Sequence, residues 1–219
     1  MKNILSPSIL SIDFKNMGRQ IGDVDKAGAE YLHVDVMDGM FVPSISLGMP
    51  VIKSIRSATD RVFDVHLMIM DPIRYIEEFA KAGADIITFH LEAAPDAGAV
   101  IDKIHSLGKR AGITIKPGTA VEELIPYLDC VDMILLMTVE PGFGGQAFIE
   151  GSYERIRTLR RMLDERGLTT DIEVDGGINL KNVESVIDAG ANVIVAGSAV
   201  FIGDAAENTK SFMKILAKN

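Results

Sequence analysis

The sequence contains no tryptophan, few other aromatic residues and a single cysteine. Cys130 cannot form a disulfide within the chain, and it lies in an apolar run, so we expect a buried, unreactive thiol in a reducing compartment. No apolar run is long enough to cross a bilayer, and no signal-peptide cleavage pattern follows Lys2. The sequence therefore predicts a cytoplasmic protein that does not engage a membrane.

Basic residues are also scarce relative to acidic ones. The 22 Lys and Arg against 31 Asp and Glu leave a net charge of −9. An acidic surface repels nucleic acids and anionic membranes, which argues against both as partners, whereas a small anionic substrate remains compatible with it. An apolar fraction of 47% and the absence of a linker-like tract predict one domain over residues 1–219.

A recurring glycine-containing segment divides the chain into similar units. The segments Ala27–Glu30, Ala82–Asp85 and Ala189–Asn192 each end a helical pattern with a glycine and precede a short β-branched run. This repetition indicates successive strand–helix units. The expected strands are Ile4–Leu10, Tyr31–Met37, Val62–Met68, Ile86–Leu91, Ala111–Ile115, Met133–Thr138, Asp171–Asp175 and Asn192–Ala196.

Amphipathic stretches such as Pro72–Ala82 and Tyr153–Arg166 separate these strands and predict helices. Eight strands alternating with helices, in a chain of 219 residues, favour an α/β fold of the (β/α)₈ TIM-barrel type. A doubly wound open sheet is the alternative, although no GxGxxG motif follows the first strand.

The most unusual stretch is Tyr31–Gly39. Its alternation makes it a strand, and residues two apart on a strand share a face, so His33 and Asp35 point the same way. A histidine beside a carboxylate on a buried strand is costly unless the pair is hydrogen-bonded or binds a metal. The turn signal Asp38-Gly39 places the pair at the carboxyl end of the strand, where α/β folds keep their chemistry.

Two more such residues close other strands. His66 follows Asp64 in alternation, and Asp175 precedes Gly176-Gly177. Together with His33 and Asp35 they supply two imidazoles and two carboxylates to the barrel mouth. This donor set suits Zn²⁺, Fe²⁺, Mn²⁺ or Co²⁺ better than Mg²⁺ or Ca²⁺, which prefer oxygen ligands. The convergence predicts a site for a divalent metal ion.

The other histidines and three methionines are better explained by structural roles than by chemical ones. His90 ends a strand with no acidic neighbour on its face, so a structural role is the better interpretation, and His105 in a helical run is expected at the surface. The methionines Met37, Met68 and Met137 lie near strand ends. Core filling is their default role, and an apolar lid over a reacting carbon is the alternative.

Three glycine signals lie late in the chain and contain no Arg or Lys. Each follows a strand and leads toward a helix, and they comprise Pro141–Gln146, Gly176-Gly177 and Gly197-Ser198. Glycine lets bare backbone N–H groups approach an anion, and phosphate sites in such barrels form after the seventh and eighth strands. These loops therefore predict a phosphate site.

Taken in order, these motifs resemble the ribulose-phosphate 3-epimerase family along essentially the whole chain. The matching segments are Ser6–Ser11, His33–Gly39, Asp64–Met68, Pro141–Gln146 and Val174–Asn179. The resemblance implies a metal-dependent enzyme that inverts C3 of D-ribulose 5-phosphate to give D-xylulose 5-phosphate in the pentose phosphate pathway. It also implies a homo-oligomer.

The resemblance also implies roles for individual positions. One divalent metal ion per subunit would be held by His33, Asp35, His66 and Asp175, and Asp35 and Asp175 would be the acid/base pair acting through an enediolate. Inversion needs proton transfer on both faces of one carbon, which two bases on opposite walls would provide. The substrate-contacting positions would be Ser8, His66, Gly142, Phe143, Gly144, Gly145, Asp175, Gly176, Gly177, Gly197 and Ser198.

Three residues depart from the family pattern: Met40, Ser44 and Lys116 stand where histidine, asparagine and asparagine are common. They leave open a hexulose-phosphate (allulose 6-phosphate) 3-epimerase. A non-catalytic phosphosugar-binding barrel is a further alternative, since it would need the glycine loops but not both aspartates. A metal-barrel hydrolase is disfavoured because its His-x-His pair is missing from the first strand, and related decarboxylases are disfavoured because no lysine follows Asp35.

Overall fold

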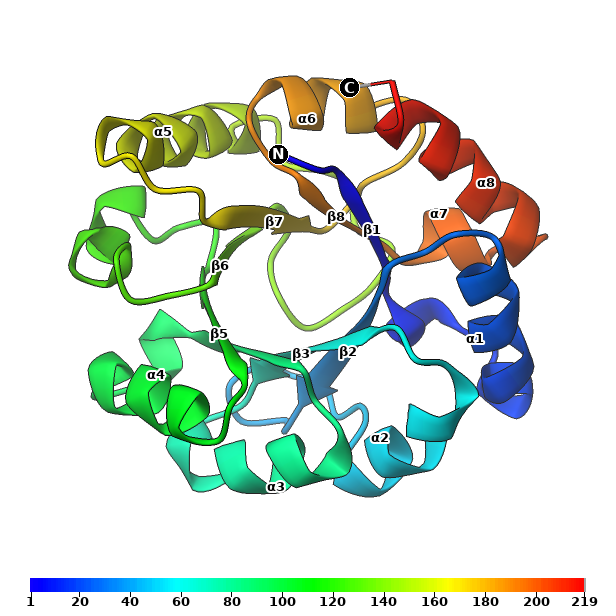
Figure 1. Cartoon of the computed structure of the whole chain (residues 1–219), viewed down its shortest axis with the longest axis horizontal. Coiled ribbons are helices and arrows are strands. Elements are labelled where there is room, and N and C mark those ends of the chain that lie inside the picture. Colours follow the sequence, from blue (N-terminus) through cyan, green and yellow to red (C-terminus); the bar gives the residue numbers. More distant parts are fainter. Residues whose placement is uncertain (219) are drawn as a thin grey trace.

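Eight parallel strands surround a barrel axis in the computed structural model, which describes residues 1–218 (Figure 1). They are β1 (Ile4–Pro7), β2 (Tyr31–Met37), β3 (Val62–Met68), β4 (Ile86–His90), β5 (Arg110–Ile115), β6 (Met133–Met137), β7 (Asp171–Asp175) and β8 (Val193–Ala196). From β2 to β8 each strand pairs with the next in the sequence, and β8 pairs with β1. The predicted (β/α)₈ architecture is confirmed.

Helices form an outer ring around the strands (Figure 1). The α-helices are α1 (Met17–Lys26), α2 (Met49–Ile55), α3 (Ile76–Ala82), α4 (Ala97–Ser106), α5 (Ser152–Glu165), α6 (Val183–Asp188), α7 (Ser198–Phe201) and α8 (Ala205–Leu216). Short 3₁₀ helices are η1 (Ile9–Ser11), η2 (Phe14–Asn16), η3 (Arg56–Ala58), η4 (Pro72–Arg74), η5 (Leu91–Ala93) and η6 (Val121–Tyr127). Within residues 1–218, no helix has both the length and the apolar character needed to traverse a bilayer.

Most expected boundaries agree with the structure to within one residue, and the exceptions have local causes. The first strand ends at Pro7 rather than Leu10, because the Ser8 side chain accepts a hydrogen bond from the Leu10 N–H and begins η1. The helix expected over Pro72–Ala82 is divided at Tyr75 into η4 and α3.

The expectation for Cys130 is wrong. Its side chain is exposed, because the residue lies in the turn after η6, where its N–H donates to the Tyr127 carbonyl. The apolar neighbours Leu128 and Val131 are buried, but the turn directs the Cys130 side chain to the surface.

The barrel interior changes character from one end to the other. At the amino ends of the strands, the interior is filled by an apolar cluster of Tyr31, Ile86, Met133 and Val193. Farther along the strands, many of the inward positions are polar and buried, and these include His33, Asp64, His66, Thr88, Thr114 and Glu173. The outward positions of β2, such as Val34, join the main core beneath the helices. The main apolar core therefore lies between the strands and the surrounding helices, and polar groups are concentrated inside the carboxyl end of the barrel.

The barrel closes between β1 and β2 with fewer connections than elsewhere. A parallel bridge joins Ser8 to His33, and the Glu30 N–H donates to the Leu5 carbonyl at 3.3 Å. By contrast, β2 and β3 pair along their full lengths, from Tyr31 opposite Val62 onward. The closing bridge thus includes His33 itself.

Candidate active site and metal centre

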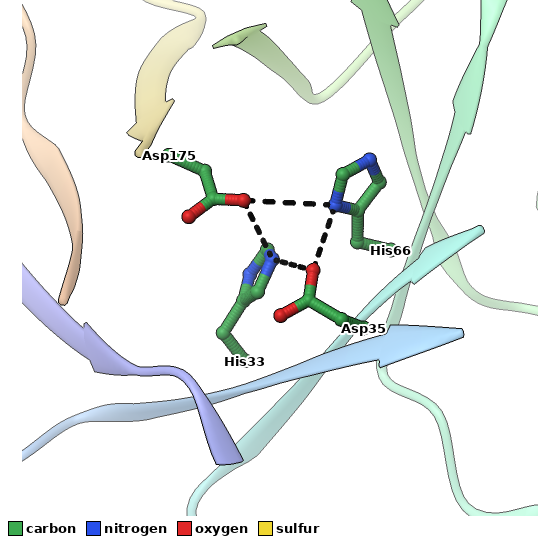
Figure 2. Close-up of side chains that lie close together, drawn as sticks. All are labelled: His33, Asp35, His66 and Asp175. Atoms are coloured by element: carbon green, nitrogen blue, oxygen red, sulfur yellow. Dashed lines mark hydrogen bonds and ion pairs between the residues drawn. The ribbon is translucent and has the colours of Figure 1, made fainter. Parts of the chain in front are cut away.

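Four side chains from three strands meet at the barrel mouth (Figure 2). On β2, His33 Nε2 lies 3.3 Å from Asp35 Oδ1, and His66 Nδ1 on β3 lies 3.1 Å from the same oxygen. Asp175 Oδ2 on β7 lies 3.9 Å from His33 Nε2 and 4.0 Å from His66 Nδ1. The structure therefore brings together the four residues that the sequence singled out as metal ligands.

The arrangement fits a divalent cation. One donor atom from each of the four residues lies within 4.8 Å of the others. His33 Nε2 is buried and makes no hydrogen bond, while Nδ1 of the same ring donates to Asp64 Oδ2 at 2.6 Å. A ring whose Nδ1 donates to a carboxylate presents its other nitrogen as a ligand, as metal-bound histidines generally do. Two nitrogens and two oxygens match the donor set expected for Zn²⁺ or Fe²⁺.

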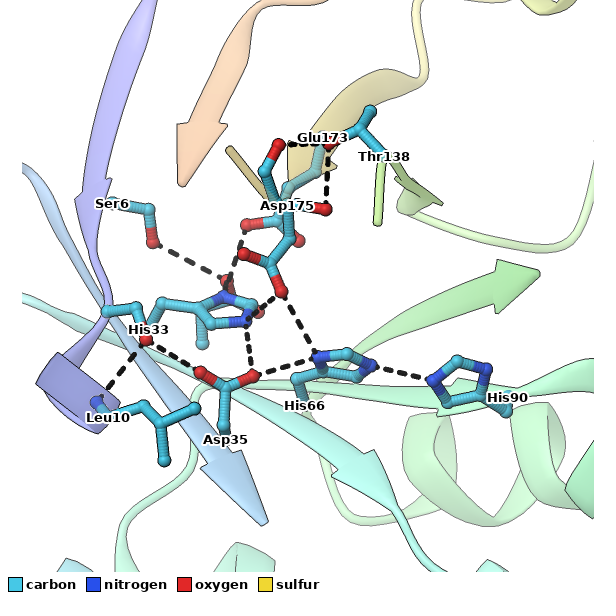
Figure 3. Close-up of polar contacts among 12 residues, drawn as sticks. Ser6, Leu10, His33, Asp35, His66, His90, Thr138, Glu173 and Asp175 are labelled. Atoms are coloured by element: carbon cyan, nitrogen blue, oxygen red, sulfur yellow. Dashed lines mark hydrogen bonds and ion pairs between the residues drawn. The ribbon is translucent and has the colours of Figure 1, made fainter. Parts of the chain in front are cut away.

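Two buried carboxyl groups lie close to His33 Nδ1, and Figure 3 labels one of them, Glu173. Besides Asp64, Glu173 Oε1 lies 3.4 Å from His33 Nδ1, and both acids are fully buried. Burial lowers the pKa of His33, but the charges of Asp35, Asp64 and Glu173 outweigh it and raise that pKa well above its usual value. Burial and then the Asp64 charge raise the pKa of Glu173 well above its usual range.

Asp64 and Glu173 belong to the site although they were not predicted from the sequence. The signal was present, because each stands two residues before a predicted ligand on the same strand and so shares its inward face. They lie one step deeper in the barrel, behind the ligands rather than among them.

The two aspartates of the site have different surroundings. Asp35 accepts a 2.6 Å hydrogen bond from Ser8 Oγ; burial raises its pKa, but the His33 and His66 rings dominate and hold that pKa far below its usual value. Asp175 is less enclosed, with 18% of its side chain exposed. Burial and the negative charge of Asp35 raise the pKa of Asp175 to about 6. One carboxyl is held ionised and the other binds a proton more readily.

His90 is not isolated, contrary to the sequence-based interpretation. Its Nε2 lies 2.9 Å from His66 Nε2, and its Nδ1 lies 3.4 Å from Glu92 Oε2, so an acidic neighbour does reach it. Glu92 follows the strand in η5, where the alternation no longer applies. Burial lowers the pKa of His90 to about 4, which leaves the ring neutral. His105 is partly exposed and contacts Asp132, as expected of a surface residue.

A pocket of about 480 Å³ opens above the four-residue cluster. Asp35 and Asp175 line it, whereas His33 and His66 are fully buried beneath its floor. The other sequence-predicted substrate positions that line it are Ser8, Gly142, Phe143, Gly144, Gly145, Gly176, Gly177, Gly197 and Ser198. Polar lining residues that were not predicted individually are Ser11, Gln146 and Asn179, which lie in the quoted motifs, and Glu140 and Asn208, which lie outside them. None of the residues lining this pocket in the described part of the chain is Lys or Arg.

The glycine turn after β7 is shaped for close backbone approach. Gly177 has φ +69°, and a Cβ at this position would lie 2.3 Å from the Phe148 backbone nitrogen. The Thr138 hydroxyl holds the turn by donating to the carbonyls of Asp175, at 2.9 Å, and Gly176, at 2.6 Å. The turn thus fixes the backbone immediately after Asp175.

Three methionines, Met37, Met68 and Met137, are buried and line the pocket beside the aspartates. They give its inner wall an apolar surface next to the polar cluster. The three departures from the family pattern, Met40, Ser44 and Lys116, are not among the lining residues, and the Met40 side chain is turned to the surface.

Comparisons with known proteins show which family the chain is similar to. A sequence model of the ribulose-phosphate 3 epimerase family matches residues 4–201. The ribulose-phosphate 3-epimerase of Synechocystis sp. is 53% identical to the chain, over 91% of the chain and 88% of the relative. That of Bacillus subtilis is 50% identical over 90% and 91%, and the chloroplastic enzyme of Arabidopsis thaliana is 48% identical over 90% and 71%.

Solved structures share the fold at low sequence identity. A ligand-bound structure of KGPDC from Streptococcus mutans superposes with a TM-score of 0.77 at 14% identity, covering 99% of this chain and 98% of the other. A 3-hexulose-6-phosphate synthase gives 0.71 at 18% identity, covering 98% and 99%. At such identities the likeness shows the barrel alone.

Proposed function

The chain belongs to the ribulose-phosphate 3-epimerase family and is an enzyme of that activity, and from this premise we propose how its residues perform the reaction. The proposal is that His33, Asp35, His66 and Asp175 hold one divalent metal ion, of the Zn²⁺, Fe²⁺, Mn²⁺ or Co²⁺ class, at the carboxyl ends of the strands. The observation that carries it is the convergence of these four donors under a glycine-lined pocket. When bound, the ion would supply positive charge beside the oxygens of the substrate as negative charge develops on them.

Asp35 and Asp175 are proposed as the acid/base pair. They reach the pocket from β2 and β7, and inversion of C3 requires a proton to leave one face of the carbon and another to arrive at the opposite face. Ser8 orients the Asp35 carboxylate through its 2.6 Å hydrogen bond. The apolar surface of Met37, Met68 and Met137 would keep water away from the anionic intermediate.

The substrate phosphate is proposed to lie on the glycine loops. These loops, Gly142–Gly145, Gly176-Gly177 and Gly197-Ser198, line one side of the pocket, where no cationic side chain is present among the lining residues. Backbone N–H groups would therefore do the holding. The phosphate would anchor the sugar so that C3 lies between the aspartates, which predicts that unphosphorylated ribulose is a very poor substrate.

A pentulose phosphate is the favoured substrate over a hexulose phosphate. The residues that raised the question, Met40, Ser44 and Lys116, stand outside the pocket lining and leave its walls as they are. We also propose that the enzyme works as a homo-oligomer in the cytoplasm, with no nucleic-acid or membrane partner. Exposed apolar residues on neighbouring mouth loops, Met40, Ile45 and Met70, give subunits a surface for association.

Metal removal tests the proposed site. Chelation should abolish the epimerase activity, and Zn²⁺, Fe²⁺, Mn²⁺ or Co²⁺ should restore it; full activity in rigorously metal-free protein would contradict the proposal. His66→Ala should weaken metal binding, measured by competition with a chelator, while His105→Ala should not. A coupled assay comparing D-ribulose 5-phosphate with D-allulose 6-phosphate decides the sugar, and faster turnover of the latter would favour the hexulose alternative.

A further inference from the structure

His66 is backed by a second histidine that the mechanism above does not use (Figure 3). The two Nε2 atoms of His66 and His90 lie 2.9 Å apart, and both rings are fully buried. At that separation one nitrogen must carry a hydrogen and the other must accept it. The contact therefore has a direction, and that direction determines which nitrogen of His66 presents a lone pair to the pocket.

Only one direction leaves His66 able to bind a metal. If His66 carries its hydrogen on Nε2 and donates it to His90, its Nδ1 presents a lone pair beside Asp35 and Asp175. Because Asp35 Oδ1 lies only 3.1 Å from that lone pair, this tautomer needs a cation between the two atoms, and a bound metal ion would supply it. His90 then carries its own hydrogen on Nδ1, a buried nitrogen that makes no hydrogen bond of standard geometry and lies 3.4 Å from Glu92 Oε2. In the opposite direction, the His90 Nδ1 lone pair would face the Glu92 carboxylate, with an acceptor against an acceptor.

Glu92 is built to remain an acceptor. Its Oε1 accepts hydrogen bonds from the Lys116 N–H at 2.8 Å and the Thr119 hydroxyl at 2.5 Å. The Arg155 guanidinium holds this turn by donating to the carbonyls of Lys116 and Thr119. Burial raises the pKa of Glu92, but its contacts with His90, Thr119 and the Lys116 backbone prevail and lower it to about 2. Glu92 is thus an ionised carboxylate with its second oxygen free to face His90.

Phe41 shields this chain of polar contacts from the solvent. Its ring centroid lies 4.7 Å from that of His90, and Lys116 Nζ lies 4.0 Å from the Phe41 ring centroid on the outside. With bulk water kept away, His90 has few alternatives to the two polar partners it contacts.

We propose that Glu92 and His90 are positioning residues that favour the tautomer of His66 in which Nδ1 serves as a metal ligand. The inference rests on the proposed metal site and deepens it. His90 would orient the His66 ring as Asp64 orients the His33 ring. The neighbour of His66 is an imidazole, and the charged carboxylate, Glu92, lies one residue beyond it. Loss of such an outer partner commonly weakens metal binding by about 10- to 100-fold.

Glu92→Gln is the sharpest test, because it changes polarity with little change in volume. The glutamine carbonyl can keep the bonds from Lys116 and Thr119, which turns the amide NH₂ toward His90 Nδ1. His90 must then accept there and carry its hydrogen on Nε2, so His66 can no longer donate to it. We expect the affinity for Zn²⁺, measured by competition with a chelator, to fall by about 10- to 100-fold.

A spectroscopic readout separates this role from general support of the fold. In the ¹⁵N NMR spectrum of the Zn²⁺-loaded wild type, the hydrogens should lie on Nε2 of His66 and on Nδ1 of His90, and in Glu92→Gln the His90 hydrogen should move to Nε2. His90→Leu should weaken Zn²⁺ binding similarly, and His90→Gln should restore it to within a few-fold, because its amide oxygen can accept from His66. If His90→Leu fails to fold, the Glu92→Gln result still decides.

The control is His105→Gln, the same substitution at the surface histidine, which should leave Zn²⁺ affinity unchanged. Suppose the wild type binds Zn²⁺ and His66→Leu weakens that binding, while Glu92→Gln binds as tightly as the wild type with its His90 tautomer unaltered. The proposed metal site would then stand and the positioning chain would be overturned. If the wild type itself binds no Zn²⁺, both proposals fall.

Discussion

The two walls of the barrel mouth each carry one aspartate, and they are built differently. On the β2–β3 wall, Asp35 is almost completely buried, accepts a hydrogen bond from Ser8 and lies between two histidine rings. On the β7 wall, Asp175 is partly exposed and is followed at once by Gly176-Gly177, whose backbone must take conformations that glycine favours. One wall is a packed polar network, and the other is a carboxyl group at the edge of a glycine turn.

The difference shows how one fold makes two identical side chains unequal. The histidines hold the pKa of Asp35 far below its usual value, whereas burial and the neighbouring Asp35 charge raise the pKa of Asp175 to about 6. A two-base inversion needs one carboxylate and one carboxylic acid at the same moment. The two walls offer that asymmetry in the protein alone.

The strongest test removes the transferable proton from each wall in turn. Asp35→Asn and Asp175→Asn keep the approximate shape of the side chain, and each should lower kcat for epimerisation by about 10²-fold or more. Metal content must be measured in each variant, since loss of the metal would have the same effect. A metal-retaining variant that keeps wild-type kcat would remove that aspartate from the pair.

Isotope exchange sharpens the same comparison. In D₂O the product should gain deuterium at C3. A single variant that retains the metal should still exchange the C3 hydrogen of whichever sugar phosphate presents that hydrogen to the remaining aspartate. If epimerisation proceeds with the C3 hydrogen fully retained under every condition, separate solvent-exchanging bases are excluded, and a hydride shift or one shielded base becomes the better account.

The glycine wall should be intolerant of a side chain. Gly177→Ala places a Cβ 2.3 Å from the Phe148 backbone nitrogen at φ +69°, and should destabilise the protein by about 2 kcal/mol or more. Gly167→Ala is the matched control, because Gly167 has the same φ but an added Cβ meets nothing within 4 Å; it should cost about 1 kcal/mol. Urea denaturation measures the free energy of unfolding of both variants. Equal losses of stability would show that crowding at Gly177 is relieved.

On the opposite wall, Ser8→Ala removes the 2.6 Å hydrogen bond to Asp35. A hydrogen bond to a charged group is worth about 1.5–3 kcal/mol, so we expect kcat/KM to fall by about 10- to 100-fold. Ser106→Ala, which removes an exposed hydroxyl bonded to the Lys103 carbonyl, should leave kcat/KM unchanged. A wild-type value in Ser8→Ala would mean that the histidines alone orient Asp35.

The smallest effect is the pH dependence that the raised pKa of Asp175 imposes on metal binding. In metal-free protein this carboxyl is protonated below about pH 6; its raised pKa adds stability at low pH that is lost as the pH rises through about 6. A metal must displace that proton, so the apparent affinity should fall by about an additional tenfold per pH unit below 6. Chelator competition at pH 5 and pH 7 measures this, and Asp175→Asn should remove that added slope.

Much of this architecture could be predicted from the sequence because alternation and glycine punctuation are local signals. The strands Tyr31–Met37, Val62–Met68 and Asp171–Asp175 have the predicted bounds, since each is flanked by an unambiguous turn. Alternation also indicated which side chains face inward, and the parallel barrel brought His33, His66 and Asp175 together.

The other features of the site depend on contacts between residues far apart in the sequence, which a local pattern cannot predict. Glu92 reaches His90 from a 3₁₀ turn where the period of two has ended, and Asp64 acts through its contact with a histidine on the neighbouring strand. Cys130 is exposed because it lies in a turn, although the apolar residues around it in the sequence suggested burial. Such features arise from tertiary packing, which propensity and periodicity do not encode.

The sparse closure between β1 and β2 ties the motion of the barrel to its chemistry. The bridge that completes the ring joins Ser8 to His33, and Ser8 also binds Asp35. A local opening of this seam would separate a proposed base from its orienting hydroxyl while the seven-residue pairing of β2 with β3 stayed intact. Amide hydrogen exchange at this seam therefore reports on the fraction of time for which the enzyme is assembled for turnover.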